Sequence, residues 1–166
     1  MQCVNRDSFD SSAYMKFDPN NRIIQLCASG MQREAELDIT EAGLLYKQAW
    51  AEAGNDFEKC IAAHYLARHQ GTVESKLKWD ELALSLALKH DDNQTENILP
   101  SLFLNVGKCY EDLGNMDRAN ENYSKAEFFI ESLADDGYGR MIKSGVKAGL
   151  ARVAEKIDLM NKMHKH

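Results

Sequence analysis

The sequence predicts an all-α protein of one domain, and three observations lead to that prediction. The 166 residues contain only two prolines and are rich in alanine, leucine, glutamate and lysine, which favour helices. Capping signals recur along the chain, and apolar residues at helical spacing follow them. The predicted helices are joined by very short turns, so neighbouring helices must lie antiparallel. A chain of this length forms one compact domain with its own core.

Three helices are predicted in the first half of the chain. Asp18 and Pro19 read as an N-cap and first turn, which opens a helix to about residue 36. The run 38–41 has the spacing of a capping box and opens a second helix that stops at Gly54. The run 55–58 repeats this device for a third helix, which continues to about residue 70.

A fourth helix is predicted from Thr72 to about His90. Its segment LALSLAL, residues 82–88, alternates like a strand but lacks β-branched residues, so we interpret it as a helix packed between neighbours. The polar run 91–97 is the longest predicted internal loop. Beyond it, a fifth helix ends at Gly114, a sixth spans about 116–133, and the run DDGYG breaks the chain before a last helix from about Arg140.

The helices group into pairs. Residues 1–20 form an N-terminal arm, and one helical domain fills the rest, with pairs at about 21–54, 56–90 and 97–133 and a capping helix at about 140–163.

The last pair carries a large-large-small-large, then small-large-small order of side chains. The residues are Phe103, Val106, Gly107, Tyr110, Ala119, Tyr123 and Ala126. This order resembles the tetratricopeptide repeat. A second copy has Leu26, Gly30, Ala42, Tyr46 and Ala49, and a weaker middle copy has Ala62 and Tyr65, with its second helix displaced by an insertion.

The resemblance implies three repeats plus a C-terminal helix, stacked as a right-handed superhelix. It also explains Gly107, which would cost about 1 kcal/mol in a helix interior unless a facing aromatic ring fills the space of its side chain.

The resemblance further implies that the first helix of each pair lines a concave groove that binds a protein or peptide segment. The candidate binding residues are Met31, Lys59, Cys60, Ala63, His64, Arg68, Asn105, Lys108 and Glu111, and Asn105 and Lys108 are the expected hydrogen-bonding anchors. His64 belongs to this set if the register of the middle copy is shifted by one residue. The family's carboxylate clamp is absent, because its positions hold Cys27, Met31, Cys60, Ser101 and Asn105.

Two alternative functions stay open. Cys60 and His64 lie four residues apart on one helix face and could be two ligands of a soft metal in a sensor, completed by Cys27 or Met31, although the simpler interpretation is structural. The last helix carries one apolar stripe, which fits a capping role or a surface for a homodimer or partner helix. Its residues are Ile142, Val146, Leu150, Val153, Ile157 and Met160, and Lys143, Lys147, Arg152 and Lys156 are available for an acidic target.

Composition excludes several classes of function. The net charge of -6 argues against a general nucleic-acid binder, and no apolar run is long enough to cross a membrane. We find no hydrolase, metalloprotease, phosphate-binding or dinucleotide motif, so no enzyme activity, cofactor or metal is predicted. The four cysteines lack disulfide-type spacing. The sequence therefore predicts a cytoplasmic, non-enzymatic adaptor.

Overall fold

A computed structural model describes residues 18–89 and 93–163, and within these ranges it contains helices and no strands. In chain order they are α1 (Arg22–Ala35), α2 (Ile39–Glu52), α3 (Asp56–Ala67), α4 (Val73–Leu88), α5 (Asn93–Glu96), α6 (Leu99–Asp112), α7 (Met116–Phe129), the short 3-10 helix η2 (Ile130–Ser132) and α8 (Gly137–Met163). The all-α prediction is confirmed. Residues 1–17 of the predicted arm lie outside the described ranges.

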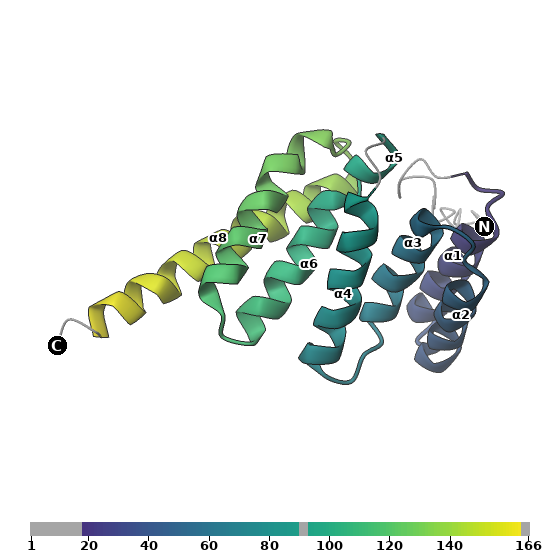
Figure 1. Cartoon of the computed structure of the whole chain (residues 1–166), viewed down its shortest axis with the longest axis horizontal. Coiled ribbons are helices and arrows are strands. Elements are labelled where there is room, and N and C mark those ends of the chain that lie inside the picture. Colours follow the sequence, from purple (N-terminus) through teal and green to yellow (C-terminus); the bar gives the residue numbers. More distant parts are fainter. Residues whose placement is uncertain (1–17, 90–92, 164–166) are drawn as a thin grey trace, which may run out of the picture.

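Adjacent helices pack side by side in pairs (Figure 1). α1 packs on α2, α3 on α4, and α6 on α7, while contacts between α4 and α6 join the second pair to the third. α8 packs against α7 and α6, and its C-terminal end projects beyond the pairs. The pairing predicted from the short turns is therefore present.

Short polar side chains begin the first four helices. Asp38, Asn55 and Thr72 each accept a hydrogen bond from the backbone N–H three residues later, as their capping signals predicted. The predicted start of the first helix is wrong by a few residues. Its N-cap is Asn21, whose side-chain oxygen accepts from the backbone N–H groups of Ile23 and Ile24 at 2.9 and 3.1 Å.

The boundaries of the later elements also differ from the predictions. The last helix begins at Gly137 and not at Arg140, because the Asp136 carboxylate accepts from the backbone N–H of Gly139 at 2.8 Å and caps the helix. The sixth predicted helix ends at Phe129 and continues as η2. The polar run 91–97 contains the short helix α5.

α4 is the helix whose sequence alternates like a strand. It packs between α3 and α6, and Ala83, Leu84 and Leu86 are buried there. Leu82 and Leu88 keep 36% and 56% of their surface exposed, so α4 is apolar on most sides without being buried on all of them. The interpretation of this segment as a packed helix is confirmed.

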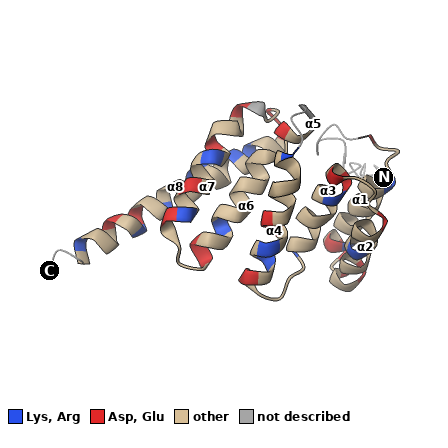
Figure 2. Ribbon diagram, in the orientation of Figure 1, with Lys and Arg blue, Asp and Glu red and all other residues tan. Residues whose placement is uncertain are grey.

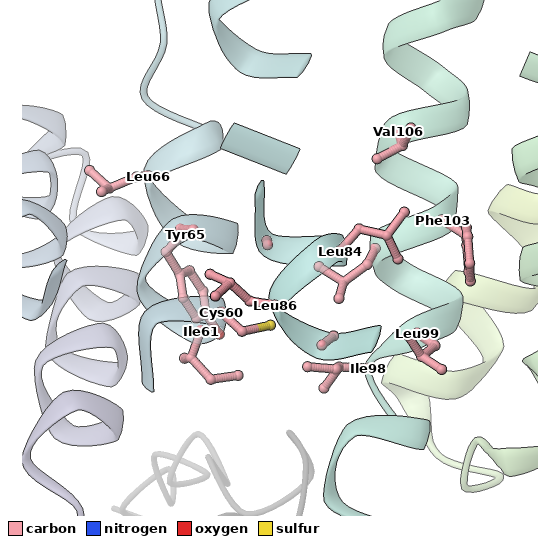
Figure 3. Packing of buried hydrophobic residues seen from close by; sticks show 14 of the residues in the cluster. Cys60, Ile61, Tyr65, Leu66, Leu84, Leu86, Ile98, Leu99, Phe103 and Val106 are labelled. Atoms are coloured by element: carbon pink, nitrogen blue, oxygen red, sulfur yellow. The ribbon is translucent and has the colours of Figure 1, made fainter. Parts of the chain in front are cut away.

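A continuous apolar core links the pairs (Figure 3). Ile61 and Tyr65 of α3 lie on one side of α4, and Phe103 and Val106 of α6 lie on the other. Because the core runs from one pair to the next, each pair is stabilised by its neighbours as well as by its own contacts.

Two glycines let the helices of a pair approach closely. A β-carbon added at Gly30 would lie 2.3 Å from Cε1 of Tyr46, and one added at Gly107 would lie 2.8 Å from Cδ1 of Tyr123. Both tyrosines are fully buried. The expectation that an aromatic ring fills the space beside Gly107 is confirmed, and Gly30 shows the same packing in the first pair.

Candidate functional site

The predicted groove residues come from the first helix of each pair. Met31 lies on α1; Lys59, Cys60, Ala63 and His64 lie on α3; Arg68 is the C-cap of α3; and Asn105, Lys108 and Glu111 lie on α6. Cys60 and Ala63 have no exposed surface and Glu111 keeps only 5%, so these three side chains lie out of reach of a partner. The other side chains are partly or fully exposed.

The first helices are joined at the α1–α3 contact by a carboxylate. Glu34 accepts from Nη2 of Arg68 at 2.7 Å and contacts Nε2 of His69 at 2.7 Å. The Glu34 side chain is 16% exposed, whereas that of Arg68 is 45% exposed. Arg68 therefore forms an ion pair with Glu34 within the fold, and part of its side chain stays exposed to solvent.

The eighth residue of the second helix in each pair also contacts the helix that follows the pair, and we call it the bridging residue. Tyr46 and Tyr123 are both the eighth residue of their helices, α2 and α7. Tyr46 stacks on Tyr65 of α3 with ring centroids 5.2 Å apart, and a β-carbon at Gly149 of α8 would lie 2.6 Å from Cζ of Tyr123. Each tyrosine thus contacts the first helix of its own pair and the helix that follows the pair, which is α3 for Tyr46 and α8 for Tyr123.

The eighth residue of α4 is Asp80, a carboxylate in the place of a tyrosine. Asp80 is fully buried. Its Oδ2 accepts from Nζ of Lys76 at 2.5 Å and from Sγ of Cys109 at 3.5 Å, and its Oδ1 accepts from Nδ2 of Asn105 at 3.4 Å. Since Asn105 and Cys109 belong to α6, a polar cluster joins the second pair to the third where tyrosine joins the others.

His64 lies beside this polar cluster. The residue as a whole is partly exposed, yet Nδ1 of its ring is buried and has no hydrogen-bond partner. Burial lowers the pKa of His64 to about 4, and the positive charges of Arg68 and Lys76 also lower it, while Asp80 opposes them. The ring is therefore neutral at physiological pH.

Acidification should destabilise the fold through His64. An unfolded histidine has a pKa near 6.5, so between pH 6.5 and 4 the unfolded chain binds a proton that the folded chain does not. Stability therefore falls as the pH is lowered through this window. At about 1.4 kcal/mol for each pH unit, the loss has an upper limit of about 3 kcal/mol. Urea unfolding at pH 7 and at pH 5 measures the part of this loss that is reached by pH 5, at most about 2 kcal/mol.

The control for this prediction is His64→Gln, which removes the titrating ring and keeps a polar side chain. We expect the variant to lose less stability than the wild type over the same pH interval. An equal loss in both proteins would contradict the assignment to His64.

Glu111 is held by α8. It accepts from Nε and Nη2 of Arg152 at 2.9 and 2.8 Å, from Nζ of Lys156 at 3.0 Å, and from the hydroxyl of Tyr123 at 2.7 Å. The Arg152 guanidinium, helped by Tyr123 and Lys156, holds the pKa of this carboxyl well below its usual range although burial opposes the shift. Glu111 is thus a structural residue, and Arg152 and Lys156 are engaged within the chain.

The alternative metal site is not supported by the geometry. Within residues 18–89 and 93–163, no cluster of three histidine, cysteine or acidic side chains is arranged to hold a metal. Burial raises the pKa of the Cys60 thiol to about 12 and that of Cys27 similarly, so neither is a thiolate at neutral pH.

The apolar stripe of α8 is largely used inside the molecule. Ile142, Val146 and Val153 are buried, as a capping helix requires. Near the end of the helix, Leu159 and Met163 are 53% and 78% exposed. The buried part of the stripe therefore matches the capping interpretation.

The Lys76–Asp80 pair was missed from the sequence. With the second helix of the middle copy displaced by an insertion, the repeat pattern does not single out Asp80. Alignment by the start of each second helix, at Ile39, Val73 and Met116, would have revealed it. The signal is a lysine and an aspartate where the other pairs have alanine and tyrosine.

None of the described helices is long and apolar enough to cross a membrane. The chain matches no protein-family model, and no curated protein matches it. The repeat pattern and the packing of its residues are thus the basis for a functional assignment.

Proposed function

We propose that this protein is a non-enzymatic adaptor that holds a protein or peptide segment along its first helices, α1, α3 and α6. The proposal includes the stacked, right-handed tetratricopeptide-like arrangement in which the first helices line a concave face. The groove function is proposed by analogy with the tetratricopeptide repeat. Because one fold can serve many functions, the residues on the first helices have to support it.

The observation that carries the proposal is the repeated bridging residue. Gly30 and Tyr46 in the first pair, and Gly107 and Tyr123 in the third, pack in the same way. The eighth residue of each second helix also contacts the next first helix or α8. This recurrence is what a stacked repeat requires, because each unit must bury its faces against its neighbours.

The exposed groove residues offer a mixed apolar and polar surface. Met31, Lys59 and His64 are partly exposed, and Lys108 is exposed beside its surface partner Asp112. Asn105 makes only a long contact of 3.4 Å to Asp80, so its amide retains hydrogen-bonding capacity. Such a surface suits a segment that presents both backbone groups and side chains.

The chemistry of the cysteines supports a cytoplasmic location. Cys27, Cys60 and Cys109 are free thiols, and all three are buried. Free buried cysteines are ordinary in a reducing compartment, where they behave as small apolar residues.

Affinity capture from a cell extract, followed by mass spectrometry, tests the proposed function. The test variant is Asn105→Arg with Lys108→Glu, which enlarges one anchor and reverses the charge of the other. The matched control is Asn120→Arg with Lys47→Glu, because these residues are exposed on α7 and α2, the second helices. Melting temperatures establish that both variants fold.

We expect wild type and control to capture the same protein, and the groove variant to lose it. Capture that survives in the groove variant, or that fails in the control alone, would overturn the proposal. Capture of nothing by the wild type would also count against an adaptor function.

A further inference from the structure

Two indole rings fill the junction between the first and second pairs. Trp50 of α2 and Trp79 of α4 meet edge to face, with ring centroids 5.0 Å apart. Both rings also pack against the core. Trp50 is the twelfth residue of its helix, and Trp79 is the seventh residue of its helix. Aromatic side chains at these two positions therefore join one second helix to the next.

The same two positions carry smaller side chains at the following junction. The twelfth residue of α4 is Leu84, and the seventh residue of α7 is Asn122. A hollow of about 400 Å³ lies against both side chains, and we call it the α4–α7 hollow. Its lining residues are Glu81, Leu84, Ser85, Leu88, Val106, Tyr110, Arg118, Glu121 and Asn122. The positions that hold indole rings at the first junction thus border an open space at the second.

The floor of the α4–α7 hollow comes from α6, which packs against both α4 and α7. Val106 and Tyr110 are buried there, at the helix positions that Ala63 and Ala67 occupy on α3. Although these floor residues are larger than the two alanines, the hollow remains open above them. The Tyr110 ring gives another aromatic ring a surface for offset or edge-to-face packing.

The rim of the α4–α7 hollow is polar, and the Tyr110 hydroxyl joins two of its side chains. This hydroxyl donates to Oε1 of Glu81 at 2.5 Å and accepts from Nη1 of Arg118 at 2.7 Å. Glu81 is exposed, and this bond uses one of its two carboxylate oxygens, so the carboxylate can accept a further hydrogen bond. An aromatic ring that carries an N–H donor, as indole does, matches an apolar floor beside such an acceptor.

We propose that the α4–α7 hollow binds the indole ring of a tryptophan on a partner segment that docks against α4 and α7. The chain itself places indole rings at the two corresponding positions one pair earlier, as Trp50 and Trp79. An aromatic anchor seated in a pocket is a common source of affinity at protein interfaces. The lining residues of the hollow do not belong to the proposed groove, so this inference does not depend on the groove.

Titration with N-acetyl-tryptophanamide, a neutral model of the tryptophan side chain, tests this inference by amide NMR spectroscopy. N-acetyl-leucinamide is the aliphatic control compound. A glycine-serine peptide with one central tryptophan is the second probe, because it presents the ring on a chain as a partner segment would.

The test variant is Asn122→Trp, which places an indole at the position that Trp79 holds in α4. Asn120→Trp is the matched control, because Asn120 is exposed on α7 and does not line the hollow. Ser85→Trp fills the hollow from its exposed rim and serves as a second filled protein, whose ring needs no space in the core.

We expect both tryptophan probes to shift the amide signals of the α4–α7 hollow in a saturable way, in the wild type and in Asn120→Trp. The filled variants should bind about tenfold more weakly or worse, because their own indole takes the place of the probe. N-acetyl-leucinamide should bind about fivefold more weakly than N-acetyl-tryptophanamide, because it lacks the ring contact with Tyr110.

Several results would overturn the inference. One is the absence of saturable shifts in the hollow up to the solubility limit of N-acetyl-tryptophanamide. Another is equal binding of the tryptophan and leucine compounds, which would show an apolar surface without preference for a ring. Unchanged binding in the filled variants would place the site elsewhere. Binding of the compound without the peptide would show that a chain cannot reach the hollow, which excludes docking of a partner segment.

Discussion

Lys76→Met should destabilise the protein by about 3–5 kcal/mol, although it removes only one partly exposed lysine. Asp80 has no exposed surface, and its remaining contacts to Asn105 and Cys109 are long, at 3.4 and 3.5 Å. Removing one partner of a buried ion pair leaves the other charge desolvated and unpaired, which is the source of the cost. Urea unfolding at neutral pH measures the change.

Two further variants isolate that cause. Lys108→Met breaks a lysine–aspartate pair of the same spacing on α6, but both of its side chains are exposed, so we expect a loss below about 1 kcal/mol. The double variant Lys76→Met with Asp80→Leu replaces the whole buried pair by apolar side chains. It should be close to wild type or more stable. A double variant as unstable as Lys76→Met alone would contradict the assignment.

Gly107→Leu should destabilise the third pair by about 1–3 kcal/mol or more through overpacking. Even a β-carbon at this position would lie 2.8 Å from the Tyr123 ring, which is fully buried and cannot move into solvent. The gain in helix propensity on replacing glycine, about 1 kcal/mol, offsets only part of this cost. The melting temperature of the variant checks the prediction.

Gly137→Leu is the control, because nothing lies within 4 Å of a β-carbon added at this first residue of α8. We expect its melting temperature to stay near that of the wild type. An unchanged melting temperature in Gly107→Leu would mean that α6 and α7 do not pack as closely as the structure describes.

Much of the fold follows from local chemistry in the sequence. Asp38, Asn55 and Thr72 cap their helices as predicted, because an N-cap needs only a side-chain oxygen and the N–H three residues on. Gly107 predicted its facing aromatic ring, because glycine in a helix interior lowers stability unless a neighbouring group fills the space of its missing side chain. The Asp136 cap was missed, since glycines at 137 and 139 suggested a break.

The site could be predicted less well, because burial depends on which helices meet. Glu111 looked like an exposed groove residue from the position of its own helix. Only the packing of α8 brings Arg152 and Lys156 to it. Asp80 is buried by contacts from α6, which no spacing within α4 reveals.

The charges along the helices gave little warning of these clusters. Figure 2 shows basic and acidic residues interspersed over the pairs and α8. Among the described acidic residues, Asp80 and Glu111 are buried, and the Glu34 side chain is 16% exposed. Sequence alone therefore located the first helices as the candidate face, and the structure showed which side chains on them remain available.

The most direct test of the adaptor function is photo-crosslinking in living cells. A photoreactive amino acid is placed singly at Lys59 or Lys108 on the first helices, and at Lys47 or Asn120 on the second helices. If a partner segment lies along the first helices, we expect covalent adducts from Lys59 and Lys108 and none from Lys47 and Asn120. Adducts only from Lys47 and Asn120 would contradict the proposed function.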